Sequence, residues 1–260
     1  MLESSVRRIG ELLEDGAVVL DIGGWGRPFA RADWVIDLMP YETRGLYGRD
    51  GEGEERFGPE TWIRRDVCDR EPYPFADKEI DFVVCSHTLE DVRDPLWVCR
   101  EMTRIGKAGY IEVPSRLEEQ SYGFQGPWVG WGHHRWLIDV EDNRIEFVLK
   151  HHVIHGRQSD HFPLSFYRTL APEQRVETLW WQDYFEYAER VMISAEELDP
   201  YVQDLVARHL GDAGHEPAAQ VAGEAQAVGA LRRLARRLVP SPIVRRDLRR
   251  AVDRLRSRAR

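Results

Sequence analysis

The chain has 260 residues, of which 42% are hydrophobic, so it is long enough for one α/β domain with additions. It contains no run of 18 apolar residues and no apolar leader in residues 1–16, so neither a membrane-spanning helix nor a signal peptide is expected. Residues 228–260 contain twelve Arg and two Asp, which gives this segment a charge of +10. Since the net charge of the whole chain is −9, residues 1–227 carry −19. An acidic body argues against nucleic acid as a partner, because phosphate binding requires a basic face.

Apolar runs alternate with helical or loop segments through the first half of the chain. Their periodicity predicts helices over 4–15 and 89–106, and strands over 17–24, 34–38, 61–67, 79–87 and 108–115. Short apolar runs that alternate with helices are typical of parallel strands covered on both faces. We therefore expect an α/β fold with a doubly wound, mostly parallel, Rossmann-like sheet.

The pattern changes after residue 115. Residues 135–151 alternate apolar and polar side chains around a Glu-Asp-Asn turn, which predicts a β-hairpin. Another strand with its neighbour is expected over 177–193, and a capped helix over 194–210. Residues 116–193 thus form a β-rich insertion on the substrate side of a domain that spans 1–210.

The C-terminal part differs in composition from this domain. Residues 211–227 lack large apolar groups and predict a linker, and residues 228–260 predict an Arg-rich helical tail. Such a tail packs on the acidic body or lies in solvent; contact with a membrane surface is the less favoured alternative. Three cysteines without metal-binding spacing, Cys68, Cys85 and Cys99, predict reduced thiols in a cytoplasmic protein.

Acidic residues and glycines follow the first two predicted strands. Asp21, Gly23 and Gly24 come directly after the first strand, and Asp37 ends the second. Ligands of doubly wound sheets bind at the carboxyl ends of strands, where glycines let the backbone approach and an acid can accept ribose hydroxyls. The dinucleotide fingerprint is not matched, because Phe29 replaces its third glycine and Asp37 follows Gly24 by only 13 residues. A tight turn without a ligand is the alternative.

Later segments extend this pattern in a fixed order. The runs LDIGG, VIDL, RDVCD, PFADKEIDFVVCSHTLEDVRDP and REMTRIGKAGYIEVPS resemble class I S-adenosylmethionine-dependent methyltransferases, specifically the small-molecule methyltransferase type 11 set, over residues 17–115. The resemblance implies binding of S-adenosylmethionine. It implies the following contacts: Asp21, Gly23, Gly24 and Trp25 at the methionine part, Asp37 at the ribose, Asp66 and Val67 at the adenine, and Ser86 and His87 beside the methyl group.

The chain departs from the family in one place. The family has glycines two and four residues after the Asp, whereas here these positions are Gly23 and Trp25. Only about ten residues separate the first two strands, so the usual intervening helix is not expected. The methionine end of the site must then be closed by Trp25, by Phe29 or by the N-terminal helix.

Aromatic and imidazole side chains follow the fifth predicted strand, where a loop can cover the substrate. Flat aromatic faces suit sugars or rings, so Trp128, Trp131 and Trp136 are candidate substrate contacts. His133 and His134 suit general-base catalysis near neutral pH. The alternative is that the tryptophans fill the hairpin core and the histidines cap its backbone.

Other polar groups in this region allow a metal. Glu118 and Glu119 are an acidic loop or, alternatively, oxygen ligands of Mg²⁺. Four further histidines, at 151, 152, 155 and 161, match no structural zinc spacing, and hydrogen-bonded or solvated side chains are favoured for them.

Together these patterns predict an S-adenosylmethionine-dependent O-methyltransferase of a hydroxylated small molecule, with a sugar or glycoside as the preferred acceptor. One of His87, His133 and His134 is expected to act as general base or to ligate a metal that acidifies the acceptor hydroxyl. The alternatives are N- or C-methylation of another metabolite, a catalytically inactive cofactor-binding scaffold, and a Rossmann dehydrogenase. The oligomeric state is left open.

Overall fold

The computed structural model describes residues 1–210, and the predicted linker and tail lie outside the described residues. Within this part, a six-stranded sheet has the order β3-β2-β1-β4-β5-β8. Its strands are β1 (Val19–Ile22), β2 (Trp34–Asp37), β3 (Trp62–Arg64), β4 (Ile80–Ser86), β5 (Gly106–Pro114) and β8 (Val176–Gln182). Strands β1 to β5 are parallel, and β8 runs antiparallel to β5. This order is that of a doubly wound sheet, so the predicted fold class is confirmed.

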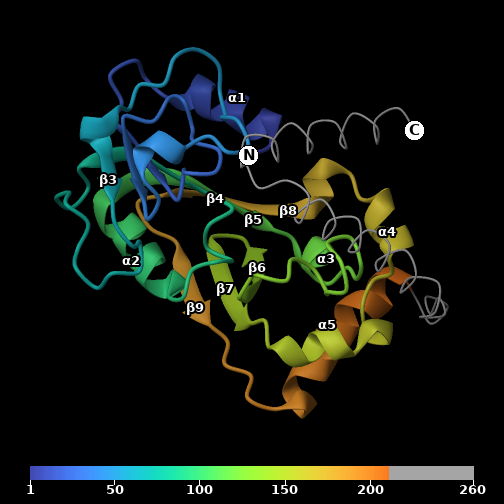
Figure 1. The fold of residues 1–260 in the computed structure, drawn as a ribbon. Coiled ribbons are helices and arrows are strands. Elements are labelled where there is room, and N and C mark those ends of the chain that lie inside the picture. The colour runs from blue at the N-terminus through green and yellow to red at the C-terminus, as the bar shows by residue number, and fades with distance from the viewer. Residues whose placement is uncertain (211–260) are drawn as a thin grey trace, which may run out of the picture.

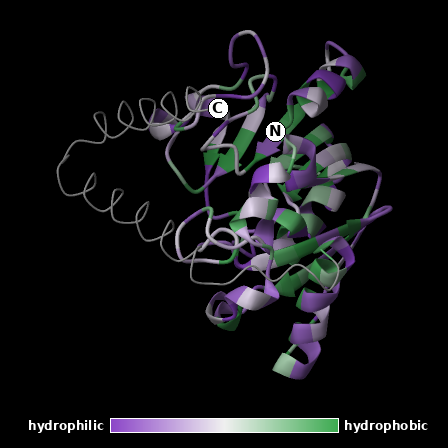
Figure 2. Ribbon diagram, turned by 90° about the vertical axis from the view of Figure 1, so that its right-hand side faces the viewer, coloured by the Kyte–Doolittle hydropathy of each residue, from purple (hydrophilic) through white to green (hydrophobic). Residues whose placement is uncertain are grey.

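Different elements cover the two faces of the main sheet (Figure 1). On one face, Ile9 of α1 (Glu3–Leu12) packs in a cluster with Val35 and Phe82 of the sheet. On the other face, Met102 of α2 (Pro95–Ile105) packs against Leu20 and its neighbours. Figure 2 shows hydrophobic strands between helices that carry both kinds of residue. Each fully buried aliphatic side chain contributes about 1.5–3 kcal/mol.

The helix α2 starts later than its periodicity predicts. It begins at Pro95, because the Asp94 side chain accepts a hydrogen bond from the Trp97 backbone N–H at 3.1 Å and proline suits the first helical position. Residues 87–94 therefore form a loop at the carboxyl end of β4. This correction to the predicted helix 89–106 matters, because the loop lies at the candidate site.

Residues 1–210 also form a second sheet of three strands, which lies on the same side of the main sheet as α2 (Figure 1). The predicted hairpin forms its strands β6 (Trp136–Glu141) and β7 (Arg144–Leu149), and β9 (Glu186–Glu189) pairs parallel to β7. The strand β8, expected with the substrate-side insertion, is instead the edge strand of the main sheet. Its side chain Leu179 and those of Ile138 and Phe147 share the core beneath that sheet.

Short helices complete the described chain. The predicted C-terminal helix is present as α5 (Ala195–Leu210). The remaining short elements are α3 (Arg116–Glu119), α4 (Leu164–Thr169) and 3-10 turns at Tyr41–Thr43, Pro59–Thr61, His152–Gly156, Gln158–Asp160 and Pro172–Arg175. No helix in residues 1–210 is long and apolar enough to cross a membrane.

The pairing of β5 with β8 can be tested at Gly109 of β5, which packs against Trp181 of β8. A Cβ added at Gly109 would lie 2.5 Å from the Val83 carbonyl oxygen and 2.6 Å from the Trp181 ring. We expect Gly109→Ala to lower the free energy of unfolding by about 1–3 kcal/mol through overpacking, as measured by urea denaturation.

The matched control is Gly10→Ala in α1, where the added Cβ meets no atom within 4 Å. This change should raise stability by about 0.5–1 kcal/mol, because alanine favours the helix. A Gly109→Ala protein as stable as the wild type would contradict the position of Trp181.

Candidate active site

The parallel strands end at one edge of the main sheet, and that edge gathers the residues predicted to bind the cofactor. Gly23, Gly24 and Trp25 follow β1, and Asp37 ends β2. Asp66 and Val67 follow β3, and Ser86 and His87 end or follow β4. The fold thus brings the predicted set to a common edge, as expected for a doubly wound sheet.

The turn after β1 requires two glycines. Gly23 has a φ of 79°, and a Cβ there would lie 2.0 Å from Thr88 Oγ1 of the loop after β4. A Cβ at Gly24 would lie 2.2 Å from Asp21 Oδ2. Both glycines are therefore required by the packing of the chain itself, which brings the two loops and the Asp21 carboxyl group into close contact.

Asp21 is buried on β1 beneath this turn. Its Oδ2 accepts a hydrogen bond from the Phe29 backbone N–H at 2.9 Å. Burial raises the pKa of Asp21 to about 7, although the bond from Phe29 opposes this change. Asp21 therefore changes its charge close to neutral pH, at the position where the resemblance puts the methionine part of the donor.

Asp37 holds the loop that replaces the missing helix. Its carboxylate accepts from the Trp25 N–H at 3.1 Å and from the Met39 N–H at 2.8 Å, and the Trp25 indole donates to Thr43 Oγ1 at 2.9 Å. Burial raises the pKa of Asp37, and its backbone hydrogen bonds oppose that rise. A carboxylate has about four lone-pair positions, so capacity remains for ribose hydroxyls.

Asp66 is paired at the end of β3. It accepts from the Cys68 N–H at 2.8 Å and forms an ion pair with Arg93. Burial opposes ionisation of Asp66, but the Arg93 guanidinium lowers its pKa. Val67 beside it is buried. Arg93 was not singled out from the sequence, and it pairs with the acid predicted to contact the adenine.

His87 lies between two buried carboxylates. Its Nε2 is 3.2 Å from Glu112 Oε1, and its Nδ1 is 3.5 Å from Glu90 Oε1. Burial lowers the pKa of His87, but hydrogen bonds and charge from Glu112 and Glu90 outweigh it and raise the pKa to about 10. Although 47% of the side chain is exposed and water screens these charges, His87 remains protonated at neutral pH. A protonated imidazole cannot accept a proton, so the structure does not favour His87 as the general base.

Glu112 is the centre of this network. It accepts hydrogen bonds from the Leu2 N–H at 2.9 Å and the Tyr110 hydroxyl at 2.5 Å, and Ser86 Oγ lies 3.4 Å from its other oxygen. The amino group of Met1 lies 3.6 Å away. Burial raises the pKa of Glu112, but His87 and the other donors outweigh it and lower it to about 2.

Glu118 and Glu119 belong to a neighbouring network. Glu118 Oε1 accepts from the Trp131 indole at 2.7 Å. Glu119 Oε1 lies 2.7 Å from His134 Nδ1, and its Oε2 lies 2.5 Å from Nζ of the fully buried Lys150. These N–H donors occupy one oxygen of Glu118 and both oxygens of Glu119, and no finding supports the Mg²⁺ site considered from the sequence.

The three predicted substrate tryptophans have different surroundings. Trp136 is buried in the main core, and its indole donates to the Val92 carbonyl at 2.8 Å. This tryptophan therefore fills the core, which was the alternative to a substrate contact. Trp131 stacks on His134 with ring centroids 5.6 Å apart. Trp128 is 45% exposed beside His155, so an open aromatic face remains at this position.

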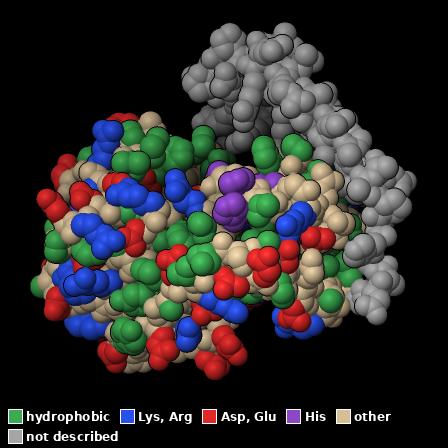
Figure 3. All heavy atoms as spheres, turned by 90° about the horizontal axis from the view of Figure 1, so that it is seen from below, with side chains coloured by type: hydrophobic (Ala, Val, Ile, Leu, Met, Phe, Trp, Pro, Cys, Tyr) green, Lys and Arg blue, Asp and Glu red, His purple; other side chains and the backbone are tan. Residues whose placement is uncertain are grey.

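The other histidines mostly support the backbone. His155 Nδ1 accepts from the Val129 N–H at 3.1 Å, and His151 Nδ1 accepts from the Val153 N–H at 3.3 Å. His151 and His152 are exposed and stack at 4.3 Å. The face shown in Figure 3 carries interspersed acidic and basic side chains with a group of histidines near its middle.

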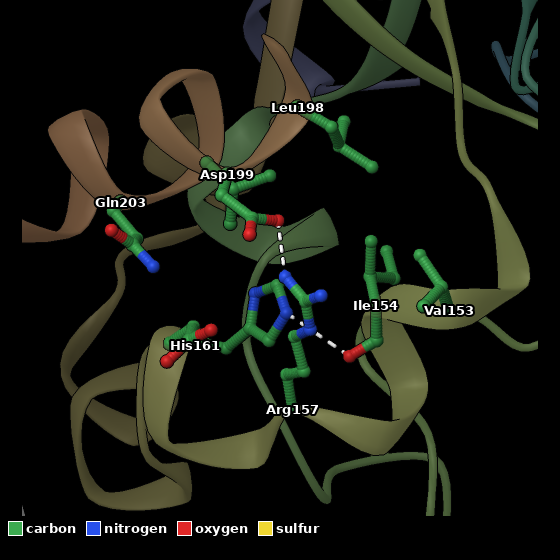
Figure 4. A pocket seen from close by; sticks show the side chains of 9 residues that line it. Val153, Ile154, Arg157, His161, Leu198, Asp199 and Gln203 are labelled. Atoms are coloured by element: carbon green, nitrogen blue, oxygen red, sulfur yellow. Dashed lines mark hydrogen bonds and ion pairs between the residues drawn. The ribbon is translucent and has the colours of Figure 1, made fainter. Parts of the chain in front are cut away.

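A small cavity lies apart from these networks, against α5 (Figure 4). It is lined by the ion pair of Arg157 with Asp199 and by His161, whose Nε2 is 3.2 Å from the Ile154 carbonyl. Its volume of about 10 Å³ accommodates at most one water. It is therefore no substrate site.

Several residues of these networks were missed from the sequence, among them Glu90, Asp91, Glu112 and Lys150. A signal was present in Glu112, because a carboxylate inside the apolar run 110–114 must be paired when its strand is buried. Glu90 is 1% exposed, and its Oε2 has no hydrogen-bond partner within residues 1–210. Such an oxygen can accept a bond from a ligand.

The protonation of His87 makes a testable prediction about pH. We expect His87→Asn, which keeps a residue tolerant of the φ of 50°, to be less stable than the wild type at pH 6. Since the pKa of His87 is raised on folding, the difference is full below about 6.5 and disappears as pH rises through about 10.

Urea denaturation at pH 6, 8 and 10 measures this difference, with the exposed His152→Asn as control. A stability difference that is independent of pH would show that His87 does not pair with Glu112 and Glu90.

Comparison with known proteins finds a methyltransferase domain in this chain. Residues 47–111 match the model of a methyltransferase domain family. None of the curated proteins matches the sequence significantly. Similar solved structures include a presumed methyltransferase of Bacillus halodurans (18% identity, TM-score 0.33, 44% of this chain and 51% of that chain). An S-adenosylmethionine-dependent methyltransferase of Mesorhizobium loti shows 16% identity and a TM-score of 0.33, over 58% of this chain and 64% of that chain.

A third structure is a complex of the Haloferax volcanii Trm112 methyltransferase activator with a presumed methyltransferase (19% identity, TM-score 0.33, 44% of this chain). The chain spans about half the length of that protein, 52%. Residues 47–111 thus carry the methyltransferase domain match that the sequence led us to expect, and they belong to a doubly wound, mostly parallel sheet.

Proposed function

We propose that this chain transfers the methyl group of S-adenosylmethionine to a hydroxyl group of a small molecule. The observation that carries the proposal is the convergence of Asp21, Asp37 and His87 at the carboxyl edge of the sheet, within a chain that matches a methyltransferase domain. In a doubly wound sheet this edge is where ligands bind.

The charges at this edge suit a cationic donor. Asp21 and Asp37 are buried carboxyl groups on two neighbouring strands. When bound, S-adenosylmethionine supplies an activated methyl group on a positively charged sulfur. The remaining acceptor capacity of Asp37 suits ribose hydroxyls, and Asp21 lies where the methionine part is expected.

The acceptor would enter over the loop after β4. There, protonated His87 can donate a hydrogen bond to the acceptor and align it, since alignment accounts for much of catalysis in group transfer. Glu90, whose Oε1 lies 3.5 Å from His87 Nδ1, would accept the hydroxyl proton. The exposed Trp128 supports a sugar or glycoside as acceptor, because sugar C–H faces stack on aromatic rings.

Calorimetry tests cofactor binding. S-adenosylhomocysteine should bind and NADH should not, and Asp37→Asn should weaken S-adenosylhomocysteine binding at least tenfold. The reason is that a charge-assisted hydrogen bond contributes about 1.5–3 kcal/mol. Asp77→Asn, at a side chain that is 79% exposed, is the matched control.

Binding of NADH without S-adenosylhomocysteine would replace the proposal with a dehydrogenase. If S-adenosylhomocysteine binds but S-adenosylmethionine is not converted to it with any hydroxylated acceptor, N- or C-methylation, or a scaffold without catalysis, would be favoured. Circular dichroism on Asp37→Asn separates a lost contact from an unfolded loop.

The raised pKa of Asp21 makes binding depend on pH. The affinity for cationic S-adenosylmethionine should increase from pH 6 to pH 8, because Asp21 loses its proton through a pKa of about 7 and a carboxylate attracts the cation. Asp21→Asn, which retains an acceptor for Phe29 N–H, should remove most of this dependence. Calorimetry at several pH values measures this affinity. If it depends on pH equally in the wild type and in Asp21→Asn, Asp21 does not contact S-adenosylmethionine.

A further inference from the structure

We propose that Asp91, His133 and His134 bind a divalent transition metal such as Zn²⁺ at the acceptor side of the active site. His133 Nε2 and His134 Nε2 lie 3.8 and 4.0 Å from the same oxygen, Asp91 Oδ1. The three candidate ligand atoms all lie within 4.8 Å of one another. Two imidazoles and one carboxylate are a known ligand set for such metals.

These separations fit metal ligands better than hydrogen-bond partners. A hydrogen bond between nitrogen and oxygen spans about 2.7–3.2 Å, so neither imidazole is bonded to Asp91. Ligands held at about 2.0–2.1 Å from Zn²⁺ in a tetrahedron lie roughly 3.3 Å from one another. The two imidazole nitrogens must approach the Asp91 oxygen by about 0.5–0.7 Å and each other by at most about 1.5 Å, and the partly exposed Asp91 and His133 side chains can rotate to do so.

A turn explains why two consecutive histidines reach one point. On a strand, adjacent side chains would face opposite sides of the sheet. Here Gly132 and His133 lie in a turn before β6, closed by a bond from the His134 N–H to the Trp131 carbonyl at 3.3 Å. The two imidazole rings therefore meet edge to face with centroids 4.6 Å apart.

Glu119 orients one of the candidate ligands. Its Oε1 lies 2.7 Å from His134 Nδ1, so a proton on Nδ1 leaves the lone pair of Nε2 directed to Asp91. Buried Lys150 holds the other oxygen of Glu119 and compensates its charge. A carboxylate on the far nitrogen is the usual outer support of a metal-binding histidine. Glu119 is thus a positioning residue and not the ligand considered from the sequence.

Hydrogen bonds also hold the two ligand-bearing loops together. The Arg135 N–H donates to the Glu90 carbonyl at 2.7 Å, and the Trp136 indole donates to the Val92 carbonyl at 2.8 Å. These bonds lie on both sides of Asp91 along the chain. The loop after β4 and the turn before β6 are consequently joined before any ion binds, which lowers the cost of assembling the site.

The position of the site indicates its use. Asp91 follows Glu90, whose Oε1 is 3.5 Å from His87 Nδ1. A metal there would bind the acceptor hydroxyl and lower its pKa, and this use rests on the proposed methyl transfer. The imidazole ligands favour Zn²⁺, Co²⁺ or Ni²⁺ over Mg²⁺, which prefers oxygen.

Metal binding by the full chain, stripped with chelator and desalted, tests the proposal without any activity. Calorimetry should show one Zn²⁺ per chain and no comparable binding of Mg²⁺. Co²⁺ should give a visible absorption band of a nitrogen-ligated ion. His133→Ala and Asp91→Asn should each weaken Zn²⁺ binding at least tenfold, whereas the exposed His152→Ala should leave it within twofold.

Both changed side chains are exposed, His133 by 63% and Asp91 by 43%, so the variants should fold, which circular dichroism checks. The proposal is overturned if Zn²⁺ does not bind, or if the two variants bind it as the wild type does. Zn²⁺ binding without S-adenosylhomocysteine binding would uphold the metal site and refute methyl transfer. Binding of S-adenosylhomocysteine without binding of Zn²⁺ would refute the metal site and leave the proposed methyl transfer standing.

Discussion

The burial of a carboxylate inside the main sheet is the constraint on which the active edge depends. Glu112 is 1% exposed on β5, and a buried charge without donors costs several kcal/mol. Five groups meet this need: His87, Tyr110, the Leu2 N–H, Ser86 and the Met1 amino group. These contacts tie the start of α1 and the end of β4 to β5, so one charge organises three separate segments.

The same principle links this edge to the covering loop. Glu119 is also 1% exposed, and its partners His134 and Lys150 come from the turn before β6 and the end of β7. Glu90, between the two networks, contacts His87 through a side-chain oxygen and Arg135 through its carbonyl. A connected set of buried charges thus joins the loop after β4 to the turn before β6.

The short connection after β1 shows how a fold tolerates a missing helix. Phe29 and the N-terminal helix residue Ile9 share one core cluster, and Trp25 is bonded through its backbone to Asp37. The apolar burial that a crossover helix would provide thus comes from a loop side chain and α1. Asp21 and Asp37 accept the loop N–H groups that a helix would have satisfied internally.

The sequence by itself determined the parallel strands, their order along the chain, the hairpin and the set of residues at the carboxyl edge, because apolar periodicity and turn residues are local properties. The pairing of β8 with β5, the late start of α2 and the separate β7–β9 pairing depended on contacts distant in the chain. The protonation of His87 and the convergence of Asp91 with His133 and His134 were likewise decided only in three dimensions. The protonation state and the convergence depend on groups brought together from different loops, and the spacing of residues within one segment does not encode these contacts.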